Sequence, residues 1–421
     1  MDWTPKNILL LFIGVKVLRT IVELSLAFVN RGYYLNAANQ VRAKNVLNVS
    51  EADWTKTVHY TNAKFKFGLW SNLITTAVIL IFIYNHQLGA VQNIAMDFAQ
   101  KFNFGTIVEG LIFFAIIGVL SFILQLPFEI FSTFGIEKSF GFNKQTAGGF
   151  ILDKVKMIVL SIVLGGALVS GLLGVMERLG QYWWIYAWGL MTFFSLLVAY
   201  LFPTFLAPLF NKFKPLENGD LKEELDKLAT KIDFKTSGIS VMDASKRSTH
   251  ANAYFTGLFG AKKIVLFDTL LQSLSTSETV SVLAHELGHF KLGHVRSSLI
   301  KSVALSGLTF YLLSLALPHL EFYQAFGLQT GVHYAALTTF SMWFGALDFF
   351  ITPITSYFSQ KNEYAADSFA KKNVGSGKDL VGALLKLREK SFSMPLSHPL
   401  YAKIYFSHPP LLMRIEELFK E

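Results

Sequence analysis

Two histidines four residues apart, His285 and His289, enclose a glutamate, Glu286. On a helix of 3.6 residues per turn the two imidazoles project about 40° apart, so both can reach one metal ion. The carboxylate of Glu286 lies beside them, where it can accept a proton from a water molecule at that metal. The pattern therefore predicts a hydrolytic zinc site that holds one Zn2+ per chain.

The residues before this motif predict the helix that must carry it. Ser275 and Glu278 have the spacing of a capping box, in which each side chain caps the backbone of the other residue. An apolar stretch from Val280 to Leu287 follows. We therefore expect a helix that begins at Ser275 and displays both histidines on one face.

A catalytic zinc ion usually takes three protein ligands and leaves a fourth position for water. Candidates for the third ligand are His250, His294, Glu363, His398 and His408. His294 lies nine residues after His285, about 180° around a continuous helix, so we expect a polar residue near the helix end that faces away. Glu363 and Asp367 share a helical face, where one could bind metal while the other orients a histidine ligand. Spacing alone leaves open that both carboxylates only solvate a helix.

The composition places these residues in a membrane protein. Hydrophobic residues make up 52% of the chain and charged residues only 16%, which is too apolar for an ordinary soluble protein of this length. Segments of about twenty apolar residues can cross a bilayer as helices. Seven such spans are expected, at Ile8–Val29, Phe67–Tyr84, Ile107–Leu126, Met157–Val175, Trp183–Phe205, Ser298–Leu317 and Ala335–Ser356.

The basic residues of the connecting loops predict the orientation. The loops after spans one and three carry Arg31, Arg42, Lys44, Lys56 and Lys64, and Lys138, Lys144, Lys154 and Lys156. Those after spans two and four offer only Lys101 and Arg178, and the loop after span six has no Lys or Arg. The positive-inside rule then puts the zinc helix on the cytoplasmic side. These loops account for the net charge of +9, so no nucleic acid is expected as a partner.

Several spans contain ionisable residues. Span one has Lys16, Arg19 and Glu23 at helical spacing, and spans six and seven contain Lys301 and Asp348. Such residues normally face a bundle interior or a water-filled cavity. An ion pair between Arg19 and Glu23, with only a packing role, is the alternative.

Between spans five and six the composition becomes that of a small water-exposed domain. Lys214 to Ile232 is expected to form a charged amphipathic helix, and Gly238–Met242 and Lys263–Phe267 are expected to be strands that flank Asn252–Gly257. A free strand edge beside a zinc helix suggests an extended peptide substrate that adds itself as a further strand. The chain has no cysteine, which excludes disulfides, a thiol nucleophile and thiolate ligands.

These features together resemble the integral-membrane CAAX prenyl proteases of the Ste24 type, within the M48 family of zinc metalloproteases. The resemblance covers nearly the whole chain. It rests on seven spans, HELGH after the fifth, Glu363-Tyr364-Ala365-Ala366-Asp367 after the seventh, Ser407-His408-Pro409-Pro410 followed by Arg414, and Asn252-Ala253 with Gly257 before the zinc helix.

The resemblance implies roles for individual residues. Glu363 would be the third zinc ligand beside His285 and His289, and Asp367 would hold a ligand histidine from behind. Glu286 would be the general base. Substrate backbone would bind at Asn252 and Ala253, and His408 with Arg414 would bind substrate or stabilise the oxyanion.

The resemblance also implies a mostly α-helical fold, in which seven membrane helices surround a water-filled chamber and a small α+β zinc protease domain closes one side. The parts would be residues 1–207 (spans one to five), 208–297 (catalytic region with the HExxH helix), 298–358 (spans six and seven) and 359–421 (the rest of the catalytic domain). The substrate would be the CaaX terminus of a prenylated peptide or protein. We expect a monomer in contact with membrane lipid, in a bacterial inner membrane or the endoplasmic reticulum.

Two alternatives stay open at this point. One is a membrane quality-control protease of the HtpX kind with no need for a prenyl group, although that group usually has fewer spans. The other is a seven-span receptor or transporter with a structural zinc site. A structural site would want four protein ligands and no position for water, whereas this motif supplies a general base.

Overall fold

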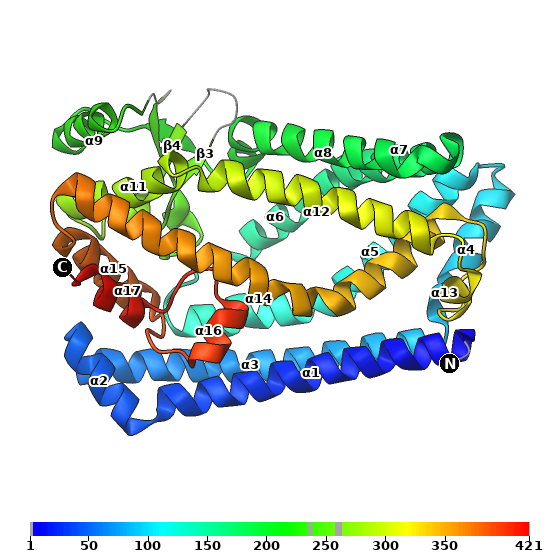
Figure 1. The fold of residues 1–421 in the computed structure, drawn as a ribbon, viewed down its shortest axis with the longest axis horizontal. Helices are drawn as coiled ribbons and strands as arrows, with labels where there is room; N and C mark the ends of the chain where they lie inside the picture. The colour runs from blue at the N-terminus through cyan, green and yellow to red at the C-terminus, as the bar shows by residue number, and fades with distance from the viewer. Residues whose placement is uncertain (1–2, 235–237, 257–262, 421) are drawn as a thin grey trace.

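Long helices lie side by side along the longest axis of the molecule, and a small sheet with short helices is gathered at one end (Figure 1). The computed structural model describes residues 3–234, 238–256 and 263–420. The long helices are α1 (Pro5–Leu35), α3 (Glu51–Tyr84), α5 (Thr106–Ile130), α6 (Ala147–Leu160), α7 (Gly166–Arg178), α8 (Trp183–Leu201), α12 (His294–Ala316) and α14 (His333–Val374).

Six stretches of the described chain are long and apolar enough to cross a membrane. They are Glu51–Tyr84, Thr106–Glu137, Ala147–Arg178, Gly180–Leu209, His294–Ala316 and His333–Val374. Predicted spans two to seven coincide with them. In the most apolar part of each stretch, only 6–33% of the residues are buried within the protein. This low burial suits helices that expose apolar faces to lipid.

Seven spans were predicted, but only six stretches of the described chain are long and apolar enough, and α1 is not among them. It is 31 residues long, and its apolar part is interrupted by Lys16, Arg19 and Glu23. Arg19 Nε donates to Glu23 Oε1 at 2.7 Å, and a second guanidinium nitrogen donates to the carbonyl of Gly345 on α14. The expected ion pair is therefore present, and it also connects two long helices.

The sheet has four strands in the order β1-β2-β4-β3. Strands β2 (Ile239–Met242) and β4 (Lys263–Phe267) are parallel, whereas β1 (Phe213–Pro215) and β3 (Ala253–Thr256) pair antiparallel with their neighbours. The predicted strands are confirmed, except that Gly257 lies outside the described residues.

The predicted helix over Lys214–Ile232 is wrong at its start. Lys214 and Pro215 form part of β1, and helix α9 covers only Asp220–Lys231. Proline lacks the N–H that a helix interior requires, and Pro215 therefore fits an edge strand better than a helix.

The other α-helices lie mainly at the two ends of the molecule. They are α2 (Ala37–Leu47), α4 (Gln87–Lys101), α10 (Asp268–Leu271), α11 (Thr276–Lys291), α13 (Leu320–Gln324), α15 (Lys378–Ser391), α16 (Pro399–Tyr405) and α17 (Leu411–Leu418). One hydrophobic core includes Leu266, Leu283 and Ile415 near the sheet, and a second includes Phe113 and Phe326 near α13. Both ends of the long helices are thus anchored in packed cores.

Helix α14 joins the membrane-spanning part to the sheet end without interruption. It runs for 42 residues, contains Pro353 in its interior and carries Glu363 and Asp367 in its last third. Figure 1 shows it crossing the molecule in yellow to orange and ending beside α11 and α15.

Candidate active site

The helix that carries the histidines, α11, begins as the sequence predicts. Ser275 N donates to Glu278 Oε2 at 2.8 Å and Ser275 Oγ accepts from Glu278 N at 3.3 Å, which completes the capping box. Burial opposes the charge of Glu278, but Lys386 at 2.7 Å and the cap hydrogen bonds keep its pKa below the usual value. The start of the helix is thus fixed by both hydrogen bonds and charge.

Helix α11 packs unusually close to α14 at Gly288. A Cβ atom at this position would lie 3.1 Å from a ring carbon of Phe369 and 3.3 Å from the Cα atom of Ala366. Distances this short would force the neighbours apart. The glycine between the two histidines therefore permits the approach that brings Glu363 to them.

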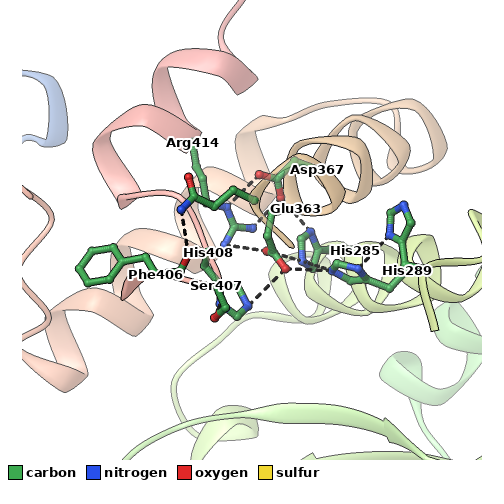
Figure 2. Close-up of polar contacts among 10 residues, drawn as sticks. His285, His289, Glu363, Asp367, Phe406, Ser407, His408 and Arg414 are labelled. Atoms are coloured by element: carbon green, nitrogen blue, oxygen red, sulfur yellow. Dashed lines mark hydrogen bonds and ion pairs between the residues drawn. The ribbon is translucent and has the colours of Figure 1, made fainter. Parts of the chain in front are cut away.

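Three side chains from these helices converge on one point (Figure 2). His285 Nε2 lies 3.2 Å from His289 Nε2 and 3.4 Å from Glu363 Oε2, and His289 Nε2 lies 3.2 Å from Glu363 Oε1. One ligand atom from each residue falls within 4.8 Å of the others. Glu363 is only 4% exposed, and its Oε2 atom has no hydrogen-bond partner.

This donor set fits a divalent metal ion. Two imidazole nitrogens and a carboxylate are common ligands of catalytic zinc and leave a coordination position open. A buried carboxylate oxygen without a donor is costly unless a cation satisfies it. His285, His289 and Glu363 are thus the residues that could hold the metal.

His285 is held from behind by a buried ion-pair network. Its Nδ1 atom lies 2.8 Å from Asp367 Oδ1, and Asp367 accepts hydrogen bonds of 2.6 and 2.9 Å from Arg414. Burial alone would lower the pKa of His285, but its contacts with Asp367 and Glu363 raise that pKa to about 9. The network fixes the ring and leaves Nε2 directed toward the metal position.

His294 does not face away, so the expectation for this residue is wrong. Helix α11 ends at Lys291, Gly293 adopts a left-handed conformation with φ of 74°, and His294 begins α12. The turn returns His294 Nδ1 to within 3.0 Å of His289 Nδ1. The sequence contained a signal for this break, since glycine directly after a helix commonly ends it in this conformation.

Glu286 has the environment expected of a general base. It is half-buried beside the two histidines, and burial raises its pKa above the usual value despite their neighbouring charges. A carboxylate whose pKa lies closer to neutrality is a better proton acceptor and donor in catalysis.

His408 approaches the site from the segment between α16 and α17. Its Nε2 atom lies 3.3 Å from Glu363 Oε1, and its Nδ1 atom lies 2.8 Å from Ser407 Oγ. Gln360 on α14 holds this segment by donating to the carbonyl oxygens of Ala402 and Phe406 at 2.8 Å. His408 is exposed, so its imidazole can reach a molecule bound at the site.

Arg414 lies at the edge of the ligand cluster, whereas two of the candidate third ligands lie outside it. The NH1 nitrogen of Arg414 is 3.6 Å from Glu363 Oε2, while Asp367 takes its other donors. His250 stacks on Phe142, and His398 caps α16, so neither belongs to the cluster.

Strand β3 lies at one edge of the sheet, beside the helix that carries the histidines. It is bonded to β4 on one side only, and it contacts α11. Asn252 directly precedes β3 and accepts a hydrogen bond from Ala253 N at 2.8 Å through its side chain. An extended peptide can add to such an edge through backbone hydrogen bonds.

The chain is similar to known membrane proteases over nearly its whole length. Residues 34–212 match the family described as CAAX prenyl protease N-terminal, five membrane helices, and residues 215–421 match peptidase family M48. The CAAX prenyl protease 1 homolog of Arabidopsis thaliana is 40% identical over 313 residues, or 74% of each chain. The CAAX prenyl protease 1 of Saccharomyces cerevisiae is 34% identical over 395 residues, which cover 88% of this chain and 86% of the relative. The crystal structure of S. mikatae Ste24p matches over 100% of both chains with a TM-score of 0.90 and 30% identity.

Proposed function

The chain belongs to the M48 family of metallopeptidases, among the CAAX prenyl proteases, and we propose that it hydrolyses peptide bonds near the C-terminus of prenylated CaaX-type substrates. The observation that carries the proposal is the convergence of His285, His289 and Glu363 beside Glu286 and a free strand edge. We assign zinc as the metal, one ion per chain, because these ligands suit it.

The peptide would be positioned before any bond changes. Its backbone would pair with the edge of β3, with Asn252 and Ala253 at the start of that strand. Its scissile carbonyl would then lie between the ligand cluster and His408. The chemistry supplied by zinc bound at these ligands is polarisation of that carbonyl and acidification of a water molecule.

Proton transfer would be the task of Glu286. Its carboxylate accepts a proton as water oxygen bonds to the carbonyl carbon, and returns that proton to the amide nitrogen as the C–N bond breaks. His408 and the charge of Arg414 would stabilise the negative oxygen of the tetrahedral intermediate. Asp367 would keep His285 in place throughout.

The proposal includes the surroundings of the enzyme. It is an integral membrane protein, and the loop charges support an active site on the cytoplasmic side. Residues 208–297 and 359–421 would together form the catalytic domain, with 1–207 and 298–358 in the membrane. Since the chain has no cysteine, single cysteines placed in the loops can be labelled from either side, and labelling of the catalytic loop only from outside would reverse the orientation.

A broader quality-control protease of the HtpX kind would use the same catalytic residues. The match to an N-terminal region with five membrane helices and CAAX prenyl proteases among the relatives favour the prenyl-protein reading. Membership of a peptidase family sets the receptor and transporter alternative aside.

The test is cleavage of a farnesylated CaaX peptide by the purified protein, beside the unprenylated peptide and the Glu286→Gln variant. We expect the wild type to prefer the farnesylated peptide, and the variant to retain metal but lose activity by about 10²- to 10⁴-fold. Equal cleavage of both peptides would refute the prenyl preference. Full activity in the variant would remove Glu286 from the mechanism.

A further inference from the structure

A large cavity adjoins the candidate active site and extends toward α1 and α3. Its volume is about 750 Å³, which is within the usual range for ligand sites. His408 and Arg414 line it next to the ligand cluster, and Ala251 lines it just before strand β3. Lys64 of α3 also lines this cavity and a second cavity of about 470 Å³ that shares part of its wall. A peptide end leaving the ligand cluster can therefore enter a space that Lys64 faces.

The charge of the cavity wall is one-sided. Lys64, Arg388 and Arg414 line the larger cavity, and none of its lining residues is Asp or Glu. The charge of Arg414 is balanced by Asp367. In the described part of the chain, no carboxylate lies within 4.0 Å of the Lys64 ammonium or the Arg388 guanidinium. Two positive charges thus remain for an anion in the cavity.

The neighbours of these cations hold them without neutralising them directly. Lys64 Nζ donates to the hydroxyl of Tyr60 at 3.3 Å, and that hydroxyl donates to Glu137 at 2.7 Å. Arg388 is 4% exposed and donates to Thr57 Oγ1 at 2.6 Å. Glu137 contacts Tyr60 and not Lys64 itself, so the ammonium group of Lys64 can still bind an anionic partner.

The strand edge determines which end of a peptide would arrive there. Antiparallel pairing is the more stable arrangement for an added strand. A peptide antiparallel to β3 would run from the Thr256 end toward the Ala253 end. Its carboxyl end would then emerge beside Ala251, at the wall of the larger cavity.

We infer that this cavity contains a subsite for the free C-terminal carboxylate of the substrate, with Lys64 as the specificity-determining cation and Arg388 reinforcing its field. The inference rests on the proposed function. Three residues follow the scissile bond of a CaaX terminus, and they reach about 10 Å when extended, so the carboxylate must lie close to the ligand cluster. A substrate ending there would gain a charge-assisted hydrogen bond that an internal peptide segment lacks.

The experiment compares kcat/KM for two farnesylated peptides that differ only in a free C-terminal carboxylate or a C-terminal amide. The wild type should prefer the carboxylate by about tenfold or more. Lys64→Gln should remove most of that preference while leaving the amide peptide unchanged. The matched control is Lys66→Gln on the same helix, because Lys66 lines neither cavity, and it should retain the preference.

The outcomes separate this inference from the proposed function. Cleavage of both peptides at equal rates by the wild type would refute the carboxylate subsite and leave the protease assignment intact. An equal loss for both peptides in Lys64→Gln would assign Lys64 a structural role and also refute it. Cleavage of neither peptide by zinc-loaded wild type would overturn both proposals.

An anionic lipid headgroup is the other source of a negative group. Short-chain phosphatidic acid added to the assay distinguishes the two. Inhibition that Lys64→Gln relieves, combined with no preference for the peptide carboxylate, would assign the cations to lipid and overturn the inference. A carboxylate preference that persists in neutral lipid would support it.

Discussion

The charged groups around the ligand cluster are paired, whereas those of the adjoining cavity are not. Behind the cluster, Asp367 contacts both His285 and Arg414 at 2.6–2.9 Å, and all three are nearly inaccessible to solvent. In the cavity, Lys64 and Arg388 contact hydroxyl oxygens, a carbonyl oxygen and aromatic rings, and no carboxylate of the described residues lies within 4.0 Å of either cation. The paired region fixes ligand geometry before a substrate arrives, and the unpaired region keeps its charge for the substrate.

This difference follows from the cost of burying charge. A buried ion must be paired and hydrogen-bonded, or it destabilises the fold by several kcal/mol. Lys64 is exposed and can instead remain hydrated until a ligand displaces the water, whereas the buried Arg388 is held by hydrogen bonds to Thr57 and Ser393. Substitutions should therefore affect stability most in the paired region and substrate choice most in the cavity.

The largest effect is expected from Arg414→Met, which leaves Asp367 buried without its guanidinium partner. Breaking a buried pair in this way costs about 3–5 kcal/mol, so thermal unfolding of the purified protein should shift strongly downward. The double variant Arg414→Met with Asp367→Leu removes both charges and should recover part of the loss. A wild-type unfolding temperature for the single variant would contradict the importance of the pair.

The next effect concerns pH in metal-free protein. The pKa of His285 is raised in the fold from its usual value of 6.5 to about 9. The protonated ring therefore stabilises the fold fully below pH 6.5, and this contribution, at most about 3 kcal/mol, is lost as pH rises toward 9. The unfolding temperature of chelator-treated protein should fall over this window.

Metal binding should show the opposite trend over the same pH window. Zinc requires the neutral imidazole, so the rise in unfolding temperature on adding zinc should grow as pH rises. The same increment at pH 6.5 and pH 9 would refute the coupling between His285 and the metal.

A smaller effect is expected from His294→Ala. The contact of 3.0 Å between His294 and His289 orients a ligand from its far side, and loss of such a partner typically weakens metal binding about 10- to 100-fold. Zinc affinity measured by competition with a chelator is the readout. The control is His319→Ala, an exposed histidine that precedes α13, beyond the far end of α12; this variant should bind zinc as tightly as wild type.

The smallest effect is expected from the surface pair between Arg42 and Glu416, whose side chains are 61% and 36% exposed. Exposed pairs contribute about 0–1 kcal/mol. Arg42→Gln should thus change the free energy of unfolding by less than about 1 kcal/mol, despite the short contact. A loss comparable to that of Arg414→Met would contradict the distinction between buried and exposed pairs.

Local sequence signals predicted the elements that chain neighbours determine. Ser275 and Glu278 placed the start of α11 correctly, because a capping box involves residues only three apart. Short segments rich in apolar and β-branched residues located β2 and β4. All seven predicted spans coincide with helical stretches, and only α1, whose apolar stretch is interrupted by ionisable residues, is not among the six that are apolar enough to cross a membrane.

Contacts between distant elements could not be derived in this way. The choice of Glu363 among five possible third ligands depends on the packing of α11 against α14, which spacing does not encode, and only the resemblance to a family selected it. The error for His294 has a similar origin. The predicted direction of His294 assumed one continuous helix. The helix ends before Gly293, whose left-handed conformation changes the direction of the chain.

Because α14 continues as one helix from the membrane to Glu363, the thickness of the bilayer should influence the rate of the reaction. Glu363 lies ten residues beyond Pro353 on one helix, a distance of about 15 Å along its axis, so a tilt of only about 4° there would displace the carboxylate by roughly 1 Å. Helices tilt when their apolar length and the surrounding hydrocarbon thickness differ. The membrane span would thus act as a lever on the third ligand, and acyl-chain length would adjust turnover without touching the substrate.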